Sequence, residues 1–560
     1  MYDHWCMTPI VGGSQKRFER FRSGVLNLGF GALDVSEGID WSADPFGTQM
    51  WGFRLHNLQW LYDFYRVSKD SNDDSAAQLA NSVIADWIEH NDHPPTAPEI
   101  AWNTHVAALR ARVLLCSVMV FGGSFRGVLA DHARRIGEDA LIEPPWNHGT
   151  DQLLTLMTIG CALDDEELIG MATTRLRETL PLVIDEQGVS NEQSPTYDYY
   201  VWTQLGELAR LMFDCGLPEM PLLARRFETP KFLAHATRPD GRWAHLGDTT
   251  PKRVFSIEGT PLEYALSMGE SASPPDERVA TFDSGYAFGR SGWGEERPLS
   301  EESWYSIRFG PGRTLHGHVD HTSFTWYARG RPMIVDSGFS GYDAGEFRDY
   351  ERSEYAHSQV VVEGAGEYKW DASTRLNRYQ VGDGWESYSL EDRPYHRVLR
   401  RREIFVGHSP PVMVLRDHLR RRARKLTAVS LLHLPADTTE VHDLPTGFAV
   451  ELPSEKPITL HVFVDGAENF EHFQGWTGTG GWVGEGLLDR QEAQVLASST
   501  PGTKVTLTTV LVPTVGERPD VRVEGNRLTI AIGSELSIVE YRKRTGLLPR
   551  PDLRLRRGAS

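Results

Sequence analysis

The 560-residue sequence predicts a multidomain α+β protein, with helical hairpins in the first half and an antiparallel β-sandwich in the second. Two observations support this prediction. Apolar residues recur at helical spacing from about residue 47 to residue 240. After Pro274-Pro275 they recur in short alternating or β-branched runs between turns. Because one compact core rarely serves so long a chain, we expect a first domain over 1–275, a second over 276–545 and a basic tail over 546–560.

The helical half contains several apolar stripes of helix length, separated by Gly, Pro and polar turns such as Gly122-Gly123 and Pro144-Pro145. The stripes cover 50–64, 77–88, 106–120, 153–163, 168–184 and 202–213. Successive helices joined by short turns pack as antiparallel pairs, so this half should consist of repeated helical hairpins.

The second half contains strand-length runs. The clearest hairpin joins 398–406 to 412–417 through the turn Gly407-His408-Ser409-Pro410-Pro411. Further runs cover 323–327, 333–335, 426–434, 458–464, 504–512, 521–532 and 536–541. Many short strands separated by turns predict a sandwich.

The composition is ordinary for a globular protein, with 40% hydrophobic and 24% charged residues. The net charge of -19 argues against a nucleic-acid or anionic-membrane binder, because a negative field repels polyanions. Any acidic ligand would therefore need a locally positive site. The basic segment after Tyr541 is interpreted as a solvated tail, with a polyanion-binding arm as the alternative.

The cysteines and the N-terminus indicate the compartment only weakly. The four cysteines, Cys6, Cys116, Cys161 and Cys215, have no C-x-x-C spacing, so we expect neither a thiolate zinc site nor a disulfide framework. The N-terminus lacks the features of a secretory signal, and no apolar run is long enough for a membrane span. As written the chain is expected to be cytoplasmic; it would be periplasmic or secreted if a leader had been removed.

Metal-competent residues gather on short glycine-containing segments. His316 and His318 are separated by one glycine, so in an extended segment both imidazoles lie on one side of the chain. Asp336 closes the partner strand of a predicted hairpin, and His357 follows a loop. Two imidazoles and a carboxylate suit zinc, and Asp320 would then orient one imidazole. The alternative is surface histidines and a turn aspartate.

Two segments of the helical half place polar side chains at helix starts. Asn147 and His148 precede an apolar helix, where Asn147 or Thr150 can also serve as a simple cap. Tyr197 lies in a tyrosine-rich segment over 191–200, whose alternative role is aromatic packing. Alone, neither segment indicates a reaction.

Together these motifs resemble the heparinase II/III-like polysaccharide lyases, whose fold is an α/α toroid followed by an antiparallel β-sandwich. The resemblance extends from Trp51-Gly52-Phe53-Arg54 to the strands after Asp417. Its most specific parts are His316-Gly317-His318-Val319-Asp320, Val335-Asp336-Ser337-Gly338 and Ala356-His357. It implies that the first domain is an incomplete α/α toroid of helical hairpins.

The resemblance also implies the catalytic residues. Asn147 and His148 match the pair that binds and neutralises the uronate carboxylate, on the helical wall of an interdomain cleft. Tyr197 matches the catalytic tyrosine and His316 the catalytic histidine of the sandwich domain. Either Tyr197 or His316 can be the base in such a reaction, and the sequence leaves this open.

The metal ligands follow from the same resemblance. His318, Asp336 and His357 match a zinc set whose role is structural. In the family Asn-Thr commonly follows the third histidine, whereas here Ser358-Gln359 follows.

We therefore expect a polysaccharide lyase that cleaves a uronic-acid-containing glycan by β-elimination to a 4,5-unsaturated product. Arg313, Arg352 and Tyr350 are the candidate substrate-binding residues. The expected partner is an acidic poly- or oligosaccharide, and a homodimer is left open.

Two other function classes stay open on the sequence. One is a non-catalytic glycan-binding or exopolysaccharide-assembly protein on the same scaffold, because architecture alone does not establish activity. The other is a glycoside hydrolase, which needs two opposed carboxylates. Glu192, Asp198 and Asp151 are available for that role.

Overall fold

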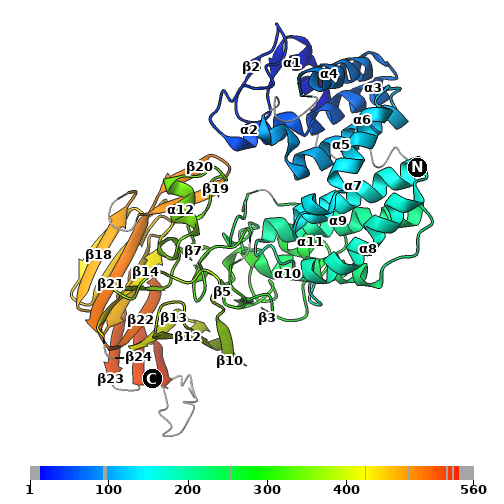
Figure 1. Cartoon of the computed structure of the whole chain (residues 1–560). Coiled ribbons are helices and arrows are strands. Elements are labelled where there is room, and N and C mark those ends of the chain that lie inside the picture. The colour runs from blue at the N-terminus through cyan, green and yellow to red at the C-terminus, as the bar shows by residue number, and fades with distance from the viewer. Residues whose placement is uncertain are drawn as a thin grey trace. The chain divides into compact units, whose positions relative to one another are not determined.

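The structure is a computed structural model that describes residues 13–91, 98–252, 254–313, 315–422, 424–476, 480–524, 527–532 and 535–540 (Figure 1). The chain divides into two compact units. The first, here called the helical unit, comprises Met1–Asp185 and Tyr200–Arg226, and the second, the sandwich unit, comprises Glu186–Tyr199 and Phe227–Ser560. The tail expected over 546–560 lies outside the described residues.

The division differs from the boundary expected near residue 275. The residues from Phe227 onward pack into the sandwich unit, since Phe232 and Trp243 share one apolar cluster with Phe282 and Trp304. The segment therefore belongs with the strands that follow it, although it contains helices α10 (Thr229–Ala236) and α11 (Pro261–Leu266).

The helical unit confirms the predicted helical half. Its neighbouring helices pack in sequence order, as α3 on α4, α5 on α6 and α7 on α8. In chain order the helices are α1 (Ser14–Arg22), α2 (Gln49–His56), α3 (Tyr62–Ser71), α4 (Ser75–Asn91), α5 (Thr104–Met119), α6 (Arg126–Ile136), α7 (Asn147–Leu163), α8 (Glu166–Val183) and α9 (Pro195–Asp214). A short pair, β1 (Val25–Leu26) and β2 (Leu33–Asp34), precedes α2.

One predicted helix was wrong, and one observed helix was not predicted. The stripe over 50–64 is not one helix, because Leu58 adopts a left-handed φ of 57° and separates α2 from α3. Helix α6 was missed since its sequence is rich in polar residues, and only Leu129, His132, Ala133 and Ile136 are buried on it.

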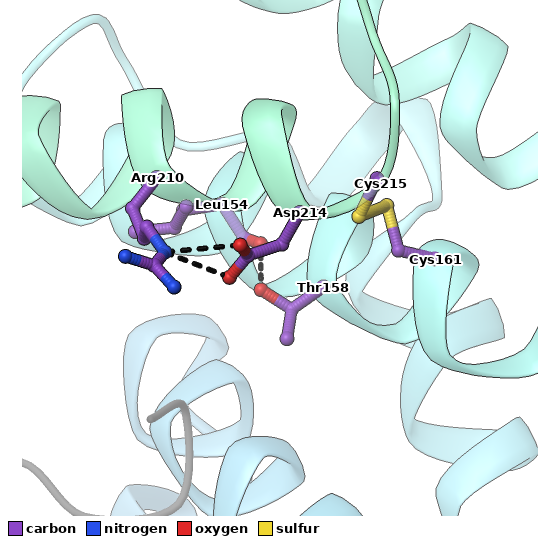
Figure 2. The surroundings of a disulfide bond; sticks show 6 residues. All are labelled: Leu154, Thr158, Cys161, Arg210, Asp214 and Cys215. Atoms are coloured by element: carbon purple, nitrogen blue, oxygen red, sulfur yellow. Dashed lines mark hydrogen bonds and ion pairs between the residues drawn. A yellow bond between two sulfur atoms is a disulfide. The ribbon is translucent and has the colours of Figure 1, made fainter. Parts of the chain in front are cut away.

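A disulfide contradicts the expectation, drawn from the cysteine spacing, that the cysteines are not crosslinked. Cys161 on α7 and Cys215, directly after α9, are bonded across 54 residues of sequence, with Cα atoms 6.0 Å apart (Figure 2). Next to Cys215, Asp214 accepts two hydrogen bonds from Arg210 Nε, each 3.0 Å long. Residue spacing gave no indication of this pairing, because the approach of α7 to the end of α9 is a tertiary contact.

Among its described residues, the sandwich unit is built from antiparallel sheets, apart from a parallel pairing between β19 (Trp482–Gly486) and β8 (Gly338–Phe339). The largest sheet has the order β10 (Arg375–Gly382), β11 (Trp385–Asp392), β12 (Val398–His408), β13 (Pro411–Arg421), β22 (Lys504–Thr514), β17 (Ile458–Asp465), β16 (Gly447–Leu452) and β15 (Glu440–Leu444). A second sheet has the order β18 (Asn469–Gln474), β21 (Gln494–Gly502), β14 (Leu426–His433) and β9 (Val360–Glu363). Leu415 and Val462 of the first sheet share one buried cluster with Ala428 and Leu496 of the second, as expected for a sandwich.

The described part of the unit has three further sheets. They are β3 (Val279–Phe282), β4 (Tyr286–Arg290), β5 (Trp304–Arg308), β6 (Phe324–Ala328) and β7 (Arg331–Ile334); β20 (Asp489–Glu492), β19 (Trp482–Gly486) and β8 (Gly338–Phe339); and β23 (Asp520–Glu524), β24 (Arg527–Ile532) and β25 (Glu535–Glu540). The hairpin predicted around residue 409 is confirmed as β12 and β13. The run over 521–532 is two strands, β23 and β24, rather than one.

Helix α12 (Glu346–Arg352) lies in the long connection between β8 and β9. Within the described part of the chain, none of the helices has the length and apolar character that crossing a membrane requires.

Candidate active site and metal centre

Close backbone approaches bring three segments of the sandwich unit together around His316. Gly247 has a φ of +54°, and a Cβ there would lie 2.3 Å from the carbonyl oxygen of His316 and 2.5 Å from that of Gln193. A Cβ on Gly317 would lie 2.0 Å from Gln193 Oε1. Glycine is therefore required at 247, while a side chain at 317 would have to displace that of Gln193, so both glycines allow these segments to meet.

The carboxylate of Asp248 is the hydrogen-bond centre of this site. Its Oδ2 lies 2.8 Å from His316 Nδ1, and its Oδ1 lies 2.9 Å from His318 Nε2. Arg348 of α12 binds the same carboxylate with both terminal nitrogens, at 2.6 and 2.8 Å. Asp248 is 1% exposed, so its charge is balanced inside the protein rather than by solvent.

Asp248 sets the tautomers of both histidines. Burial acts to raise the pKa of Asp248, but the hydrogen bonds from His316, His318 and Arg348 hold it well below its usual range. The ionised carboxylate can only accept hydrogen bonds, so His316 Nδ1 and His318 Nε2 donate to it. His316 Nε2, which lies 3.6 Å from Glu192 Oε2, and His318 Nδ1 are left for other interactions.

Tyr197, in the first turn of α9, lies against His316. The two rings are stacked, with centroids 3.5 Å apart and planes at 10°. The Tyr197 hydroxyl also shares a hydrogen bond with the hydroxyl of Tyr342. Burial, and then the negative charge of Asp248, raise the pKa of Tyr197. The phenol therefore keeps its proton at neutral pH and is suited to donate it.

His318, Asp336 and His357 form a buried group whose potential ligand atoms all lie within 4.8 Å of one another. His357 Nδ1 donates to Asp336 Oδ2 over 2.7 Å. In the described part of the chain, His318 Nδ1 and His357 Nε2 are buried without a hydrogen-bond partner. Two buried imidazole lone pairs beside a carboxylate fit a metal such as zinc.

Polar contacts hold the loop that contains His357. Gln359 Nε2 donates to the carbonyl oxygens of Val319 (2.6 Å) and Glu354 (3.1 Å), while Gln359 Oε1 accepts from Arg400 (3.0 Å). Gln359 is thus built into the buried framework of this chain.

The predicted role of Asp320 needs correction. Its Oδ2 accepts from Arg308 Nε over 3.0 Å, and no imidazole of the described segments is hydrogen-bonded to it. Asp248 orients His318 instead.

Asn147 and His148 belong to the helical unit, at the start of α7. Trp146 occupies the N-cap position without a side-chain cap, so Asn147 is the first helical residue rather than the cap. The ring of His148 is stacked on that of His105 at 3.9 Å, and His105 Nε2 lies 2.9 Å from Asp151 Oδ2. Their predicted roles toward substrate stay predictions.

The candidate substrate-binding residues have different environments. Arg313 and Arg352 are half-buried. Tyr350 is only 7% exposed, and its hydroxyl lies 3.4 Å from His433 Nε2. The role of Tyr350 toward substrate stays a prediction.

Several residues of this site were not found from the sequence, namely Asp248, Arg348 and Tyr342. Asp248 lies 68 residues before His316 in a segment without a recognisable motif. Only the glycine before it, which tolerates a left-handed φ, marked the position as unusual.

Comparisons with known proteins agree with the resemblance expected from the sequence. Residues 284–509 match the family model described as heparinase II/III-like, C-terminal. The whole fold is similar to that of a heparinase III crystal structure, with a TM-score of 0.77 and 16% identity over 96% of this chain and 94% of that chain. A mutant heparan sulfate lyase from Pedobacter heparinus is similar with a TM-score of 0.68 and 15% identity, over 96% and 90% of the two chains. No curated protein matches the chain. The predicted order of a helical domain and an antiparallel sandwich is thereby confirmed.

Proposed function

We propose that this chain, whose residues 284–509 form a heparinase II/III-like C-terminal domain, is a polysaccharide lyase that cleaves a uronic-acid-containing glycan by β-elimination. The main support is the stacked pair of Tyr197 and His316, in which His316 Nδ1 is hydrogen-bonded to Asp248. This arrangement places a protonated phenol beside an imidazole whose Nε2 can accept a proton. β-Elimination needs one acid and one base of this kind.

In the proposed reaction His316 is the base and Tyr197 is the acid. His316 Nε2 removes the proton from C5, next to the uronate carboxylate, and Asp248 stabilises the resulting imidazolium through Nδ1. Electrons of the C5–H bond form the C4–C5 double bond, and the C4–O4 bond breaks. Tyr197 donates its proton to the departing oxygen, and the raised pKa of Tyr197 favours this role over that of the base.

The uronate carboxylate requires stabilisation as negative charge moves onto it. The resemblance assigns this role to Asn147 and His148. An Asn147→Ala variant tests the assignment, because it should lower kcat much more than it raises KM.

We further propose that zinc binds through His318 Nδ1, His357 Nε2 and the Asp336 carboxylate. When bound, zinc supplies a positive charge and fixed coordination, which hold three loop segments together. In this proposal His318 connects the metal centre to Asp248, and the metal has a structural role.

The disulfide provides an argument about the cellular compartment of the protein. Structural disulfides persist mainly in oxidising environments, so Cys161–Cys215 favours a periplasmic or secreted location over the cytoplasm. Thiol labelling of the protein from its native source tests this, and reactive Cys215 in the folded protein would contradict it.

The test of function is a screen of uronate polysaccharides, read by the ultraviolet absorbance of a 4,5-unsaturated product. We expect the signal from the native protein and its loss in Tyr197→Phe, whereas Tyr379→Phe, at a 48% exposed tyrosine on β10, should retain it. New reducing ends without unsaturation would identify a hydrolase and overturn the proposal. Binding without turnover would identify a non-catalytic glycan-binding protein.

The hydrolase alternative gains no support from the described carboxylates. Asp198 accepts a hydrogen bond of 2.6 Å from the Ser190 backbone, and Asp151 is bound by His105 and Tyr200.

A further inference from the structure

We propose that Arg313, Arg352 and Trp370 form a subsite, beside His316, that binds an anionic sugar residue of the glycan. This inference rests on the proposed function, since it concerns the substrate of the same site. It identifies the ligand as a pyranose ring with a carboxylate or sulfate group, bound by two guanidinium groups and one indole.

Backbone pairing holds Trp370 next to Arg313. The backbone N–H of Arg313 donates to the carbonyl oxygen of Trp370 over 3.0 Å. Gly310 and Thr374 exchange two backbone hydrogen bonds, of 2.7 and 2.8 Å. These contacts join the segment leading to His316 to the loop that contains Trp370. These backbone hydrogen bonds therefore fix the position of the loop that carries Trp370.

Arg352 is fixed at the other end of the His316 segment. The carbonyl oxygen of Arg352 accepts a hydrogen bond of 3.1 Å from the backbone N–H of Val319, which follows His318 directly. Arg313 lies three residues before His316, so the two arginines lie on segments that flank the histidine on both sides.

Among the described residues, no carboxylate is hydrogen-bonded or ion-paired to either of these two guanidinium groups. Arg313 Nε and Arg352 Nε are buried and have no hydrogen-bond acceptor. Arg348 contrasts with them, since the Asp248 carboxylate binds it at both terminal nitrogens. Partly burying a cation without an acceptor costs free energy. A carboxylate or sulfate would supply the missing acceptors, because its oxygens match the planar guanidinium.

The positive charges also lie close enough to affect one another. Burial, followed by the charges of Arg352 and Arg348, lowers the pKa of Arg313 to about 10. The side chains still carry their charge at neutral pH, so the cluster is locally positive in a chain of net charge -19. An acidic glycan therefore has a favourable place to bind in spite of the overall charge.

Trp370 provides an apolar surface at this cluster. Its side chain is 56% exposed, and the guanidinium carbon of Arg313 lies 5.5 Å from its ring centroid. An exposed indole so close to a cation suits a sugar, because the C–H face of a pyranose packs on an aromatic ring while its charged substituent meets the guanidinium. A free inorganic anion would make no use of the indole.

The experiment measures oligosaccharide binding by calorimetry in the Tyr197→Phe background, where turnover should be absent. The probes are uronate oligosaccharides of equal length whose amino sugars are either N-acetylated or N-sulfated. We expect Arg313→Ala and Arg352→Ala each to weaken binding about tenfold or more, and Trp370→Ala about fivefold. Arg420→Ala on β13 and Tyr379→Ala on β10, which alter exposed side chains of the same unit, should change binding less than twofold.

The two probes distinguish the anion. Weakening confined to the N-sulfated probe assigns a sulfate, and equal weakening of both probes assigns a carboxylate. Arg313→Lys and Arg352→Gln guard against misfolding, since each keeps a long polar side chain at its position. With Tyr197 intact, the subsite variants should raise KM with kcat changed less than about twofold.

The outcomes separate this proposal from the proposed function. Unchanged binding in all three alanine variants would overturn the subsite even if the protein is an active lyase. Weakened binding in a protein that forms no unsaturated product would support the subsite and contradict the lyase.

Discussion

His316 Nδ1 donates a hydrogen bond to Asp248 Oδ2 over 2.8 Å, and the other oxygen of that carboxylate binds His318. One buried carboxylate thus orients both the proposed base and a proposed metal ligand. Arg348 closes the arrangement with two further hydrogen bonds. Because both carboxylate oxygens are used, a change at Asp248 should disturb the reaction and the metal centre together.

Asp248→Asn should lower kcat by about 10²–10⁴-fold, as expected when a carboxylate that fixes a catalytic imidazole is replaced by an amide. KM should change less, since Asp248 is buried away from solvent. Steady-state kinetics and metal analysis of the same preparation measure the two effects. Asp437→Asn, at an exposed ion pair with Arg331, is the control. A kcat within twofold of the native value would contradict the role of Asp248.

Tyr342→Phe should lower kcat far less than Tyr197→Phe. Tyr342 only shares a hydrogen bond with the Tyr197 hydroxyl, whereas Tyr197 is the proposed proton donor. We expect about tenfold for Tyr342→Phe and at least about 10²-fold for Tyr197→Phe. The production of unsaturated sugar measures both. The reverse order would make Tyr342 the acid.

Purified protein should contain about one zinc per chain, and a chelator should lower its melting temperature. The physical reason is that metal binding to a site formed only on folding stabilises the folded state. His357→Ala should abolish metal binding, whereas His442→Ala, at an exposed histidine of β15, should not. If the purified protein contains no metal, and a chelator changes neither its melting temperature nor its activity, the zinc proposal is contradicted.

Glu351 on α12 should make stability depend on pH. It is 3% exposed, and burial raises its pKa from the ordinary 4.5 to about 7, although hydrogen bonds with Ser340 act to lower it. The folded state then binds more protons than the unfolded state between these two values, so the free energy of unfolding falls as pH rises from about 4.5 to 7.

A Glu351→Gln variant should remove this dependence and be more stable than the native protein at pH 8, by about 3 kcal/mol. Urea unfolding at pH 5 and pH 8 measures the difference. Glu346→Gln, at an exposed position of the same helix, is the matched control. Equal effects of both substitutions at pH 8 would contradict the raised pKa.

The double substitution Cys161→Ser with Cys215→Ser should lower the free energy of unfolding by about 4 kcal/mol, as loop closure predicts for a crosslink of this span. Thermal or urea unfolding of the native and variant proteins measures the loss. In Cys161→Ser alone, Cys215 should react with a thiol reagent. If it reacts equally in the native protein, the disulfide is absent.

The sequence predicted the elements whose pattern is local. Helix stripes such as 153–163 and strand runs such as 398–406 depend on the period of apolar residues, and both were found. The break at Leu58 was not predicted, because the left-handed φ of this leucine does not alter the spacing of apolar residues in the sequence. The resemblance to known lyases supplied Tyr197 and His316, which periodicity alone would not have paired.

The sequence by itself thus determined the fold order and the residue types of the site, and it named His318, Asp336 and His357, which the structure brings within ligand distance of one another. Only the tertiary structure decided which atoms meet. Asp248 between His316 and His318, Arg313 over the Trp370 ring, and the Cys161–Cys215 bond all join segments far apart in the chain. The reason is physical: side-chain periodicity reports burial within a few residues, whereas hydrogen bonds and crosslinks between distant segments depend on the path of the whole chain.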